Sequence, residues 1–318
     1  MFFESFKITG LAVTQIFILG AIGYFLVKKD ILGQSGLDSL SRLVVEITLP
    51  VLIFCQLIKD FSFTLYPNWW VFPLLSIAIT ILGLTVGFFF SGFVKGQQAR
   101  MQFLSLIAFQ NSGYLPLALV AALLPKGKIE PMFIYLFLFL LGFNLIVWSF
   151  GVHMLSFSRN NKFALASLFS PPVVATLLSL ILVSLGINKL IPDFIFMPLK
   201  SVGDCTLPLA MFVVGGCLAQ IKLDKIDRKA ILLMSLAKLI ILPALGLALI
   251  IKFRLPDLIG LLILMQLAMP PATSLSVIIR NYNKEDLLIS QGVFWGHIIS
   301  IISIPIFLSL YFTLSMIE

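Results

Sequence analysis

Ten apolar stretches of roughly 20 residues, separated by short charged or turn-rich breaks, restrict this chain to a membrane fold. A bilayer core about 30 Å thick is crossed by about 20 helical residues at about 1.5 Å rise each. Hydrophobic residues make up 60% of the chain and charged residues 11%, against roughly 45–50% and about 25% in soluble domains. We therefore expect an all-α integral membrane protein with no separate soluble domain, whose spans lie near residues 8–27, 37–58, 69–93, 101–124, 131–154, 171–190, 198–219, 230–251, 257–279 and 287–313.

The first stretch, 8–27, reads as a membrane span, because no convincing cleavage site precedes Lys28 and Lys29. Ten spans place both termini on one side. The breaks after odd-numbered spans hold twelve Lys and Arg residues and the opposite breaks eight, so the positive-inside rule predicts a cell-membrane protein with both termini outside. The net charge of +8 reflects this topology, and no nucleic-acid partner is expected.

An internal repeat divides the chain. Thr48-Leu49-Pro50 and Thr206-Leu207-Pro208 recur at an offset of 158 residues, and an acidic residue precedes each proline by four positions. This offset predicts two five-helix repeats, 1–160 and 161–318. An odd number of spans inverts the second copy, as in many secondary transporters. A chance match of one tripeptide is the alternative.

Inverted-repeat transporters bind substrate where paired helices are interrupted at mid-membrane. Span 4 contains FQNSGYLPLAL and span 9, its repeat partner, contains MQLAMPPATSLS. Proline and glycine at these places predict breaks at which helix N-termini bind an anion; simple kinking is the alternative. The candidate substrate-binding residues are Gln110, Asn111, Ser112, Gly113, Pro116, Gln266, Pro270, Pro271, Thr273 and Ser274, of which the two glutamines also suit interhelical packing.

Three ionisable residues inside spans are candidates for ion coupling, namely Glu46, Asp204 and Lys238. Glu46 either takes up a proton or pairs with Arg42, four residues earlier. Asp204 either meets Lys238 or stays protonated, since Lys200 lies nearer the membrane edge. Lys238 either attracts the anion, fixes Asp204 or extends to the cytoplasmic surface.

Motifs for other chemistry are absent from the sequence. We find no HExxH or GxSxG motif and no metal-ligand spacing among Cys55, Cys205 and Cys217. His153 and His297 have no second ligand nearby in the sequence and read as structural residues. We expect no enzyme activity, no cofactor and no metal.

The TLP of span 2, the NSGYLP of span 4, the second TLP, the KLIILP of span 8 and the MPPATSLSVII of span 9 together resemble the auxin efflux carrier family. That family includes bacterial malonate or malate permease-like proteins and is similar in fold to the bile acid sodium symporters. The resemblance covers essentially the whole chain. It implies that spans 4 and 9 cross at prolines, that spans 1, 2, 6 and 7 form a scaffold, and that a transport domain moves as an elevator. In that arrangement Glu46 and Asp204 would stabilise the scaffold or a homodimer. Span 3 lacks the Asp and Lys pair of the plant proteins, which argues against plant-type auxin specificity.

We therefore expect a secondary transporter of a small organic anion, a mono- or dicarboxylate, coupled to protons or sodium. A sodium-coupled, bile-acid-type anion symporter and a channel are the alternatives.

Overall fold

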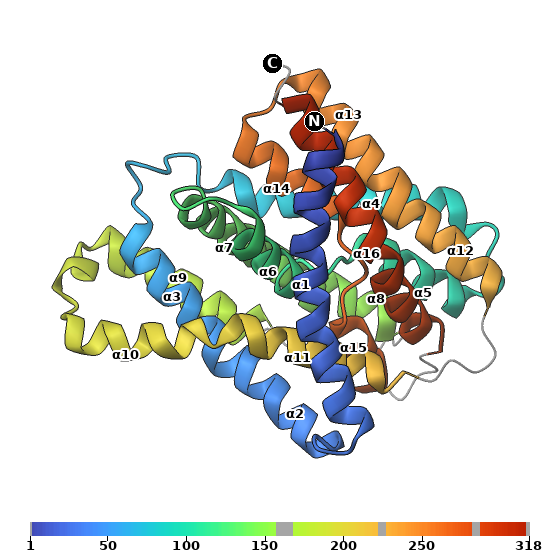
Figure 1. Ribbon diagram of the computed structural model, residues 1–318, viewed down its shortest axis with the longest axis horizontal. Helices are drawn as coiled ribbons and strands as arrows, with labels where there is room; N and C mark the ends of the chain where they lie inside the picture. The colour runs from blue at the N-terminus through green and yellow to red at the C-terminus, as the bar shows by residue number, and fades with distance from the viewer. Residues whose placement is uncertain (1, 157–167, 222–226, 282–286, 316–318) are drawn as a thin grey trace.

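The computed structural model describes residues 2–156, 168–221, 227–281 and 287–315. Within them all regular elements are helical, and a single isolated β-bridge joins Gln110 to Pro271 (Figure 1). The expected all-α class is confirmed. Five of the basic residues behind the predicted orientation, Arg159, Lys162, Lys222, Lys225 and Lys284, lie outside the described residues.

Seven helical runs among the described residues are long and apolar enough to cross a membrane. They are Phe2–Lys28, Gln34–Asp60, Val71–Ser91, Ile129–Leu155, Asp193–Ala219, Arg228–Phe253 and Leu287–Leu314. Seven differs from the expected ten because segments 101–124 and 257–279 each form two shorter helices, and the helix near 171–190 is only 14 residues long. The shorter helices are α5 (Gln97–Ala108), α6 (Tyr114–Leu123), α9 (Pro171–Ser184), α14 (Asp257–Ala268) and α15 (Ser274–Asn281).

The long runs are themselves subdivided. α1 (Phe2–Lys28), α4 (Val71–Ser91) and α16 (Leu287–Ser315) are each a single helix. The other four consist of α2 (Gln34–Leu43), η1 (Val44–Thr48) and α3 (Leu49–Asp60); α7 (Ile129–Ile146), η2 (Val147–Gly151) and α8 (Val152–Ser156); α10 (Asp193–Asp204) and α11 (Thr206–Ala219); and α12 (Arg228–Leu236), η5 (Ala237–Ile241) and α13 (Leu242–Phe253).

Proline accounts for three of these irregularities. Pro50 has no N–H for the carbonyl of Glu46, and the preceding turn winds as the π-helix η1. Pro243 follows the π-helix η5 in the same way. In the run Asp193–Ala219 the helix stops at Asp204 and restarts at Thr206, two residues before Pro208.

The helices pack as two groups that meet along α1. In the first group, α1 packs on α11, and α3 packs on α9 and α10. In the second, α4 packs on α5 and α7, and α14 packs on α13 and α16. Figure 1 shows α1 running between α2, α3, α10 and α11 on one side and α16 on the other. The groups touch where α1 and α11 meet α6, where α1 meets α16, and where α7 meets α3 and α9.

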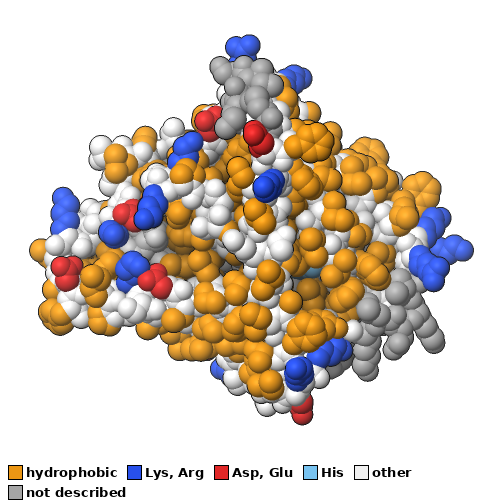
Figure 2. Space-filling model, viewed as in Figure 1, with side chains coloured by type: hydrophobic (Ala, Val, Ile, Leu, Met, Phe, Trp, Pro, Cys, Tyr) orange, Lys and Arg blue, Asp and Glu red, His pale blue; other side chains and the backbone are white. Residues whose placement is uncertain are grey.

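The outer surface suits a lipid environment. Figure 2 shows hydrophobic side chains over most of the visible face, with many Lys and Arg side chains toward its edges. Large apolar side chains such as Phe3, Phe88 and Phe194 are more than two-thirds exposed. Such exposure would be costly in water, so it indicates contact with hydrocarbon.

Candidate functional site

Two non-helical segments pair side by side in the second group. One runs from Phe109 to Gly113 between α5 and α6, and the other from Met269 to Thr273 between α14 and α15. The Asn111 N–H donates to the Pro270 carbonyl at 2.8 Å, and the Ala272 N–H donates to the Phe109 carbonyl at 3.0 Å. Gln110 and Pro271 lie opposite each other between these bonds.

A proline fits this position because both hydrogen bonds are made by its neighbours. In an antiparallel ladder, successive pairs of opposite residues alternate between hydrogen-bonded and non-hydrogen-bonded pairs. Gln110 and Pro271 form a non-hydrogen-bonded pair, so the missing N–H of Pro271 costs no bond. The two segments therefore satisfy part of each other's backbone where their helices cannot.

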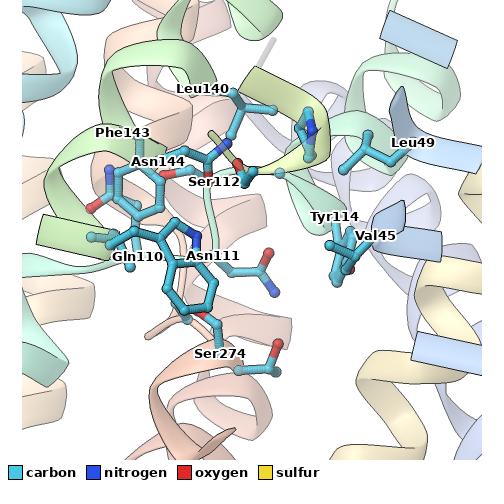
Figure 3. A pocket seen from close by; sticks show the side chains of 17 residues that line it. Val45, Leu49, Gln110, Asn111, Ser112, Tyr114, Leu140, Phe143, Asn144 and Ser274 are labelled. Atoms are coloured by element: carbon cyan, nitrogen blue, oxygen red, sulfur yellow. The ribbon is translucent and has the colours of Figure 1, made fainter. Parts of the chain in front are cut away.

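A cavity of about 150 Å³ lies against this pairing. Figure 3 shows Phe143 and Asn144 of α7 on one side, Val45 and Leu49 on the other, and the Asn111 amide between them. None of its 17 lining residues is Asp, Glu, Lys, Arg or His. They are Val45, Leu49, Gln110, Asn111, Ser112, Gly113, Tyr114, Leu140, Phe143, Asn144, Val147, Trp148, Ser170, Pro172, Ala272, Thr273 and Ser274.

Three helices begin at the cavity wall. Gly113 and Tyr114 mark the start of α6, Thr273 and Ser274 the start of α15, and Ser170 is the N-cap residue of α9. The first N–H groups of a helix have no partner within the helix, and the aligned peptide dipoles place partial positive charge there. α9 begins with Pro171 and Pro172, which have no N–H, so this helix contributes its dipole more than donors. An uncharged wall with three helix N-termini favours an anion.

Polar side chains at the cavity have unused hydrogen-bonding capacity. Both polar atoms of the Gln110 amide are buried without a hydrogen-bond partner, and so are the hydroxyl oxygens of Ser112 and Ser170. Buried polar groups are normally paired. Gln110 can supply both a donor and an acceptor to a bound molecule.

Asn111 is held by a histidine that sequence reasoning set aside as structural. His297 is fully buried on α16, and its Nδ1 lies 2.8 Å from the Val293 carbonyl. That bond requires Nδ1 to carry the proton, so Nε2 accepts from the Asn111 Nδ2, 3.4 Å away. The Asn111 Oδ1 accepts from the Leu115 N–H at 3.5 Å, so both ends of the amide have a protein partner at the long limit of hydrogen bonding.

The structure gathers six of the ten predicted substrate-binding residues at the cavity, namely Gln110, Asn111, Ser112, Gly113, Thr273 and Ser274. Pro270 and Pro271 lie in the paired segments. Gln266, in the last turn of α14, donates to the Ser112 carbonyl at 3.2 Å.

The expected break at Gly113 and Pro116 is displaced. The helix stops earlier, at Ala108, and Pro116 falls in the first turn of α6, where the missing N–H costs little. Gly113 has φ −104° and ψ −71°, a backbone conformation open to other residues. Its conformational freedom is not what creates the break.

The sequence reasoning missed the other eleven cavity residues, of which four carry a polar side-chain group, Tyr114, Asn144, Trp148 and Ser170. Asn144 carried a signal, since it is a lone amide in the apolar run FLLGFNLIVW. Ser170 stands just before Pro171-Pro172, a pattern typical of a helix start.

The ion-coupling candidates lie elsewhere. Glu46 pairs with Arg42 at 3.1 Å on the exposed surface, which is the local ion pair weighed from the sequence. Asp204 pairs with Lys200 at 2.6 Å and does not meet Lys238, so that expected contact is wrong. Neither acid lines the cavity, and their role in coupling stays a prediction.

Lys238 does not extend to the surface. It is 1% exposed, and its Nζ donates to the Ile107 carbonyl at 3.0 Å. The side chain cannot extend to the membrane surface, because η5 packs against α4, α5, α14 and α16.

Comparisons with known proteins show the family. The family described as membrane transport protein, which comprises the auxin efflux carriers, matches residues 10–308. The chain belongs to this family, and it is a multi-pass transmembrane transporter.

Relatives come from plants and archaea. An uncharacterized transporter of Methanothermobacter thermautotrophicus is 24% identical over 92% of this chain and 95% of its own length. PIN-LIKES 6 of Arabidopsis thaliana is 31% identical, but the match covers 37% of this chain and 28% of that protein. PIN-LIKES 1 of the same plant is 19% identical over 95% of this chain and 78% of its own length.

Proposed function

We propose that this transporter carries a small organic anion, a mono- or dicarboxylate, and binds it in the cavity beside the paired segments. The convergence of three helix N-termini on an uncharged wall carries the proposal. The unpartnered amide of Gln110 and the Asn111 amide add hydrogen-bonding groups for a carboxylate. The helix N-termini can attract an anion without a bound cation in the cavity.

The proposed architecture is ten membrane spans in two inverted repeats, 1–160 and 161–318. In it, α5 with α6 and α14 with α15 each make one interrupted span. The pairing of their breaks supports this reading, because irregular backbone within a bilayer is tolerated only where protein or a cavity receives it.

The proposed mechanism is elevator-type alternating access, with the group that holds the paired segments moving against α1–α3 and α9–α11. A second cavity of about 240 Å³ supports it. α7 lines the first cavity with Leu140, Phe143 and Asn144 and the second with Ile129, Glu130 and Phe133, so the two cavities lie toward opposite ends of this helix. A substrate path along the seam between α3 and α7 would join them.

Binding is tested by thermal unfolding of the purified protein with a panel of carboxylates, among them lactate, malonate and malate, and with their neutral amides. A molecule that binds the folded state raises the unfolding temperature by mass action. We expect carboxylates to stabilise the protein and the amides to leave it unchanged. Asn111→Asp should weaken carboxylate binding at least tenfold, because it places a like charge in an uncharged site.

The matched control is Asn68→Asp, since Asn68 is exposed in the connection before α4. Equal binding of carboxylates by wild type and Asn111→Asp would contradict the site. Saturable uptake into proteoliposomes distinguishes a carrier from a channel, and replacement of sodium by choline tests the sodium-coupled alternative.

A further inference from the structure

Among the lysines and arginines whose side-chain burial the structure describes, a set that leaves out Arg280, Lys238 alone is buried. It lies within the π-helix η5, near the middle of the run Arg228–Phe253. No carboxylate lies within ion-pair distance of it in the described part of the chain, and the Ile107 carbonyl is its hydrogen-bond partner. Something other than an acidic side chain must balance its charge, because an unpaired buried charge is very costly.

The partner is the C-terminal end of a helix. Ile107 lies in the last turn of α5, which stops at Ala108. The last carbonyls of a helix have no partner within it, and the aligned peptide dipoles leave partial negative charge there. The Lys238 ammonium therefore caps the negative end of α5, while α6 begins with its positive end at the cavity a few residues later.

The other repeat has no such cation. At the offset of 158 residues, Lys238 corresponds to Thr80. The Thr80 hydroxyl donates to the Ser76 carbonyl of its own helix, at 2.8 Å. The lysine at this position is thus a feature of one proposed repeat and not a general requirement of the fold.

The segment that carries Lys238 belongs to the same helix group as the cavity. η5 packs against α4, α5, α14 and α16, and α5 and α14 lead directly into the paired segments. If this group moves during transport, the ammonium moves with the bound anion.

We propose, on the basis of the transport function proposed above, that Lys238 is a tethered counter-cation. It holds the end of α5 in place and accompanies the anion, so the carrier loaded with a singly charged carboxylate crosses the membrane without net charge. The empty carrier then moves one positive charge. Lys238 is a positioning residue, since it acts on the cavity through α5 and does not line it.

The test needs no substrate. Voltage steps are applied to membranes containing the full-length carrier, and the transient charge movement of the empty protein is recorded. We expect wild type to displace up to about one elementary charge per chain, the charge of a single lysine crossing the field. Lys238→Arg should retain this movement and Lys238→Gln should lose it. Glutamine keeps a donor for the Ile107 carbonyl and removes only the charge.

Controls separate this role from a structural one. Lys252→Met removes an exposed lysine near the end of the same run and should leave the charge movement unchanged. Folding of each variant is checked by its unfolding temperature, and Lys238→Met is added to remove the donor as well. A folded Lys238→Gln protein with wild-type charge movement would overturn the proposal.

Failure of this proposal is distinguishable from failure of the proposed function. Wild-type vesicles that take up a radiolabelled carboxylate but show no charge movement would overturn the counter-cation and leave the transport function intact. If no carboxylate stabilises the protein or is taken up, the proposed anion transport is wrong, and the role of Lys238 falls with it.

Discussion

Single residues at the crossing make up for backbone groups that the irregular chain leaves unpaired. The Ser112 carbonyl precedes α6, whose first backbone bond runs from the Leu117 N–H to the Gly113 carbonyl. The Gln266 side chain from α14 donates to the Ser112 carbonyl, at 3.2 Å. A side chain beside one non-helical segment thus pairs a backbone group of the other.

This compensation predicts the effect of Gln266→Leu. The change strands a buried carbonyl and should lower the free energy of unfolding by about 1–3 kcal/mol. Unfolding in detergent compares the variant with wild type. A Gln266→Leu protein as stable as wild type would show that this hydrogen bond does not stabilise the paired segments.

At the scale of elements, close backbone contact fixes how α1 lies on α11. A Cβ added at Gly215 would collide with the backbone of Gly20, and one added at Gly23 would collide with the backbone of Phe212. Glycine is needed here for approach, because it lets two helices pack backbone to backbone as in small-residue contacts of membrane helices. This contact lies next to α6 and therefore near the start of one cavity helix.

The matched pair Gly215→Ala and Gly10→Ala tests this packing. Nothing lies within 4 Å of a Cβ at Gly10, so that variant should match wild type or gain slightly from alanine's helix propensity. Gly215→Ala must push α1 from α11 and should cost at least about 1–3 kcal/mol. Thermal unfolding compares the two. Equal stability of both variants would mean that the helices can separate freely.

At the scale of the whole molecule, two pairs of residues separated by the proposed repeat offset make the same kind of contact. Arg42 and Glu46 correspond to Lys200 and Asp204 at the offset of 158, and each pair forms an ion pair. This agreement is consistent with two related halves. The seven long helical runs by themselves do not fix how α5, α6, α14 and α15 cross the membrane.

Labelling from one side of the membrane tests the crossing. In a cysteine-free background, Lys126→Cys lies between α6 and α7, and Gln97→Cys lies at the start of α5. If α5 and α6 together cross once, the two positions face opposite sides. With both termini outside, an impermeant maleimide should label position 126 in intact cells and position 97 only after permeabilisation. Labelling of both in intact cells would exclude a single interrupted span.

The sequence alone determined the all-helical membrane class and the two proline-containing segments that pair beside the cavity. Long apolar runs form helices in lipid, and the prolines of NSGYLP and MPPATS indicated which stretches contain the interruptions. The same local signals could not say where the break would begin, because Ala108 is a good helix former and the helix ends there through pairing with residues about 160 positions away.

The tertiary structure alone decided which groups the buried polar side chains contact. Lys238 meets a backbone carbonyl of α5 instead of Asp204, His297 reaches Asn111, and Ser170 of a distant helix completes the cavity. A polar side chain bonds to the groups that lie within hydrogen-bond distance of it in the folded protein. Helix packing sets those distances, and it depends on every neighbouring side chain. Composition and periodicity describe each helix, whereas the site exists only where several helices end together.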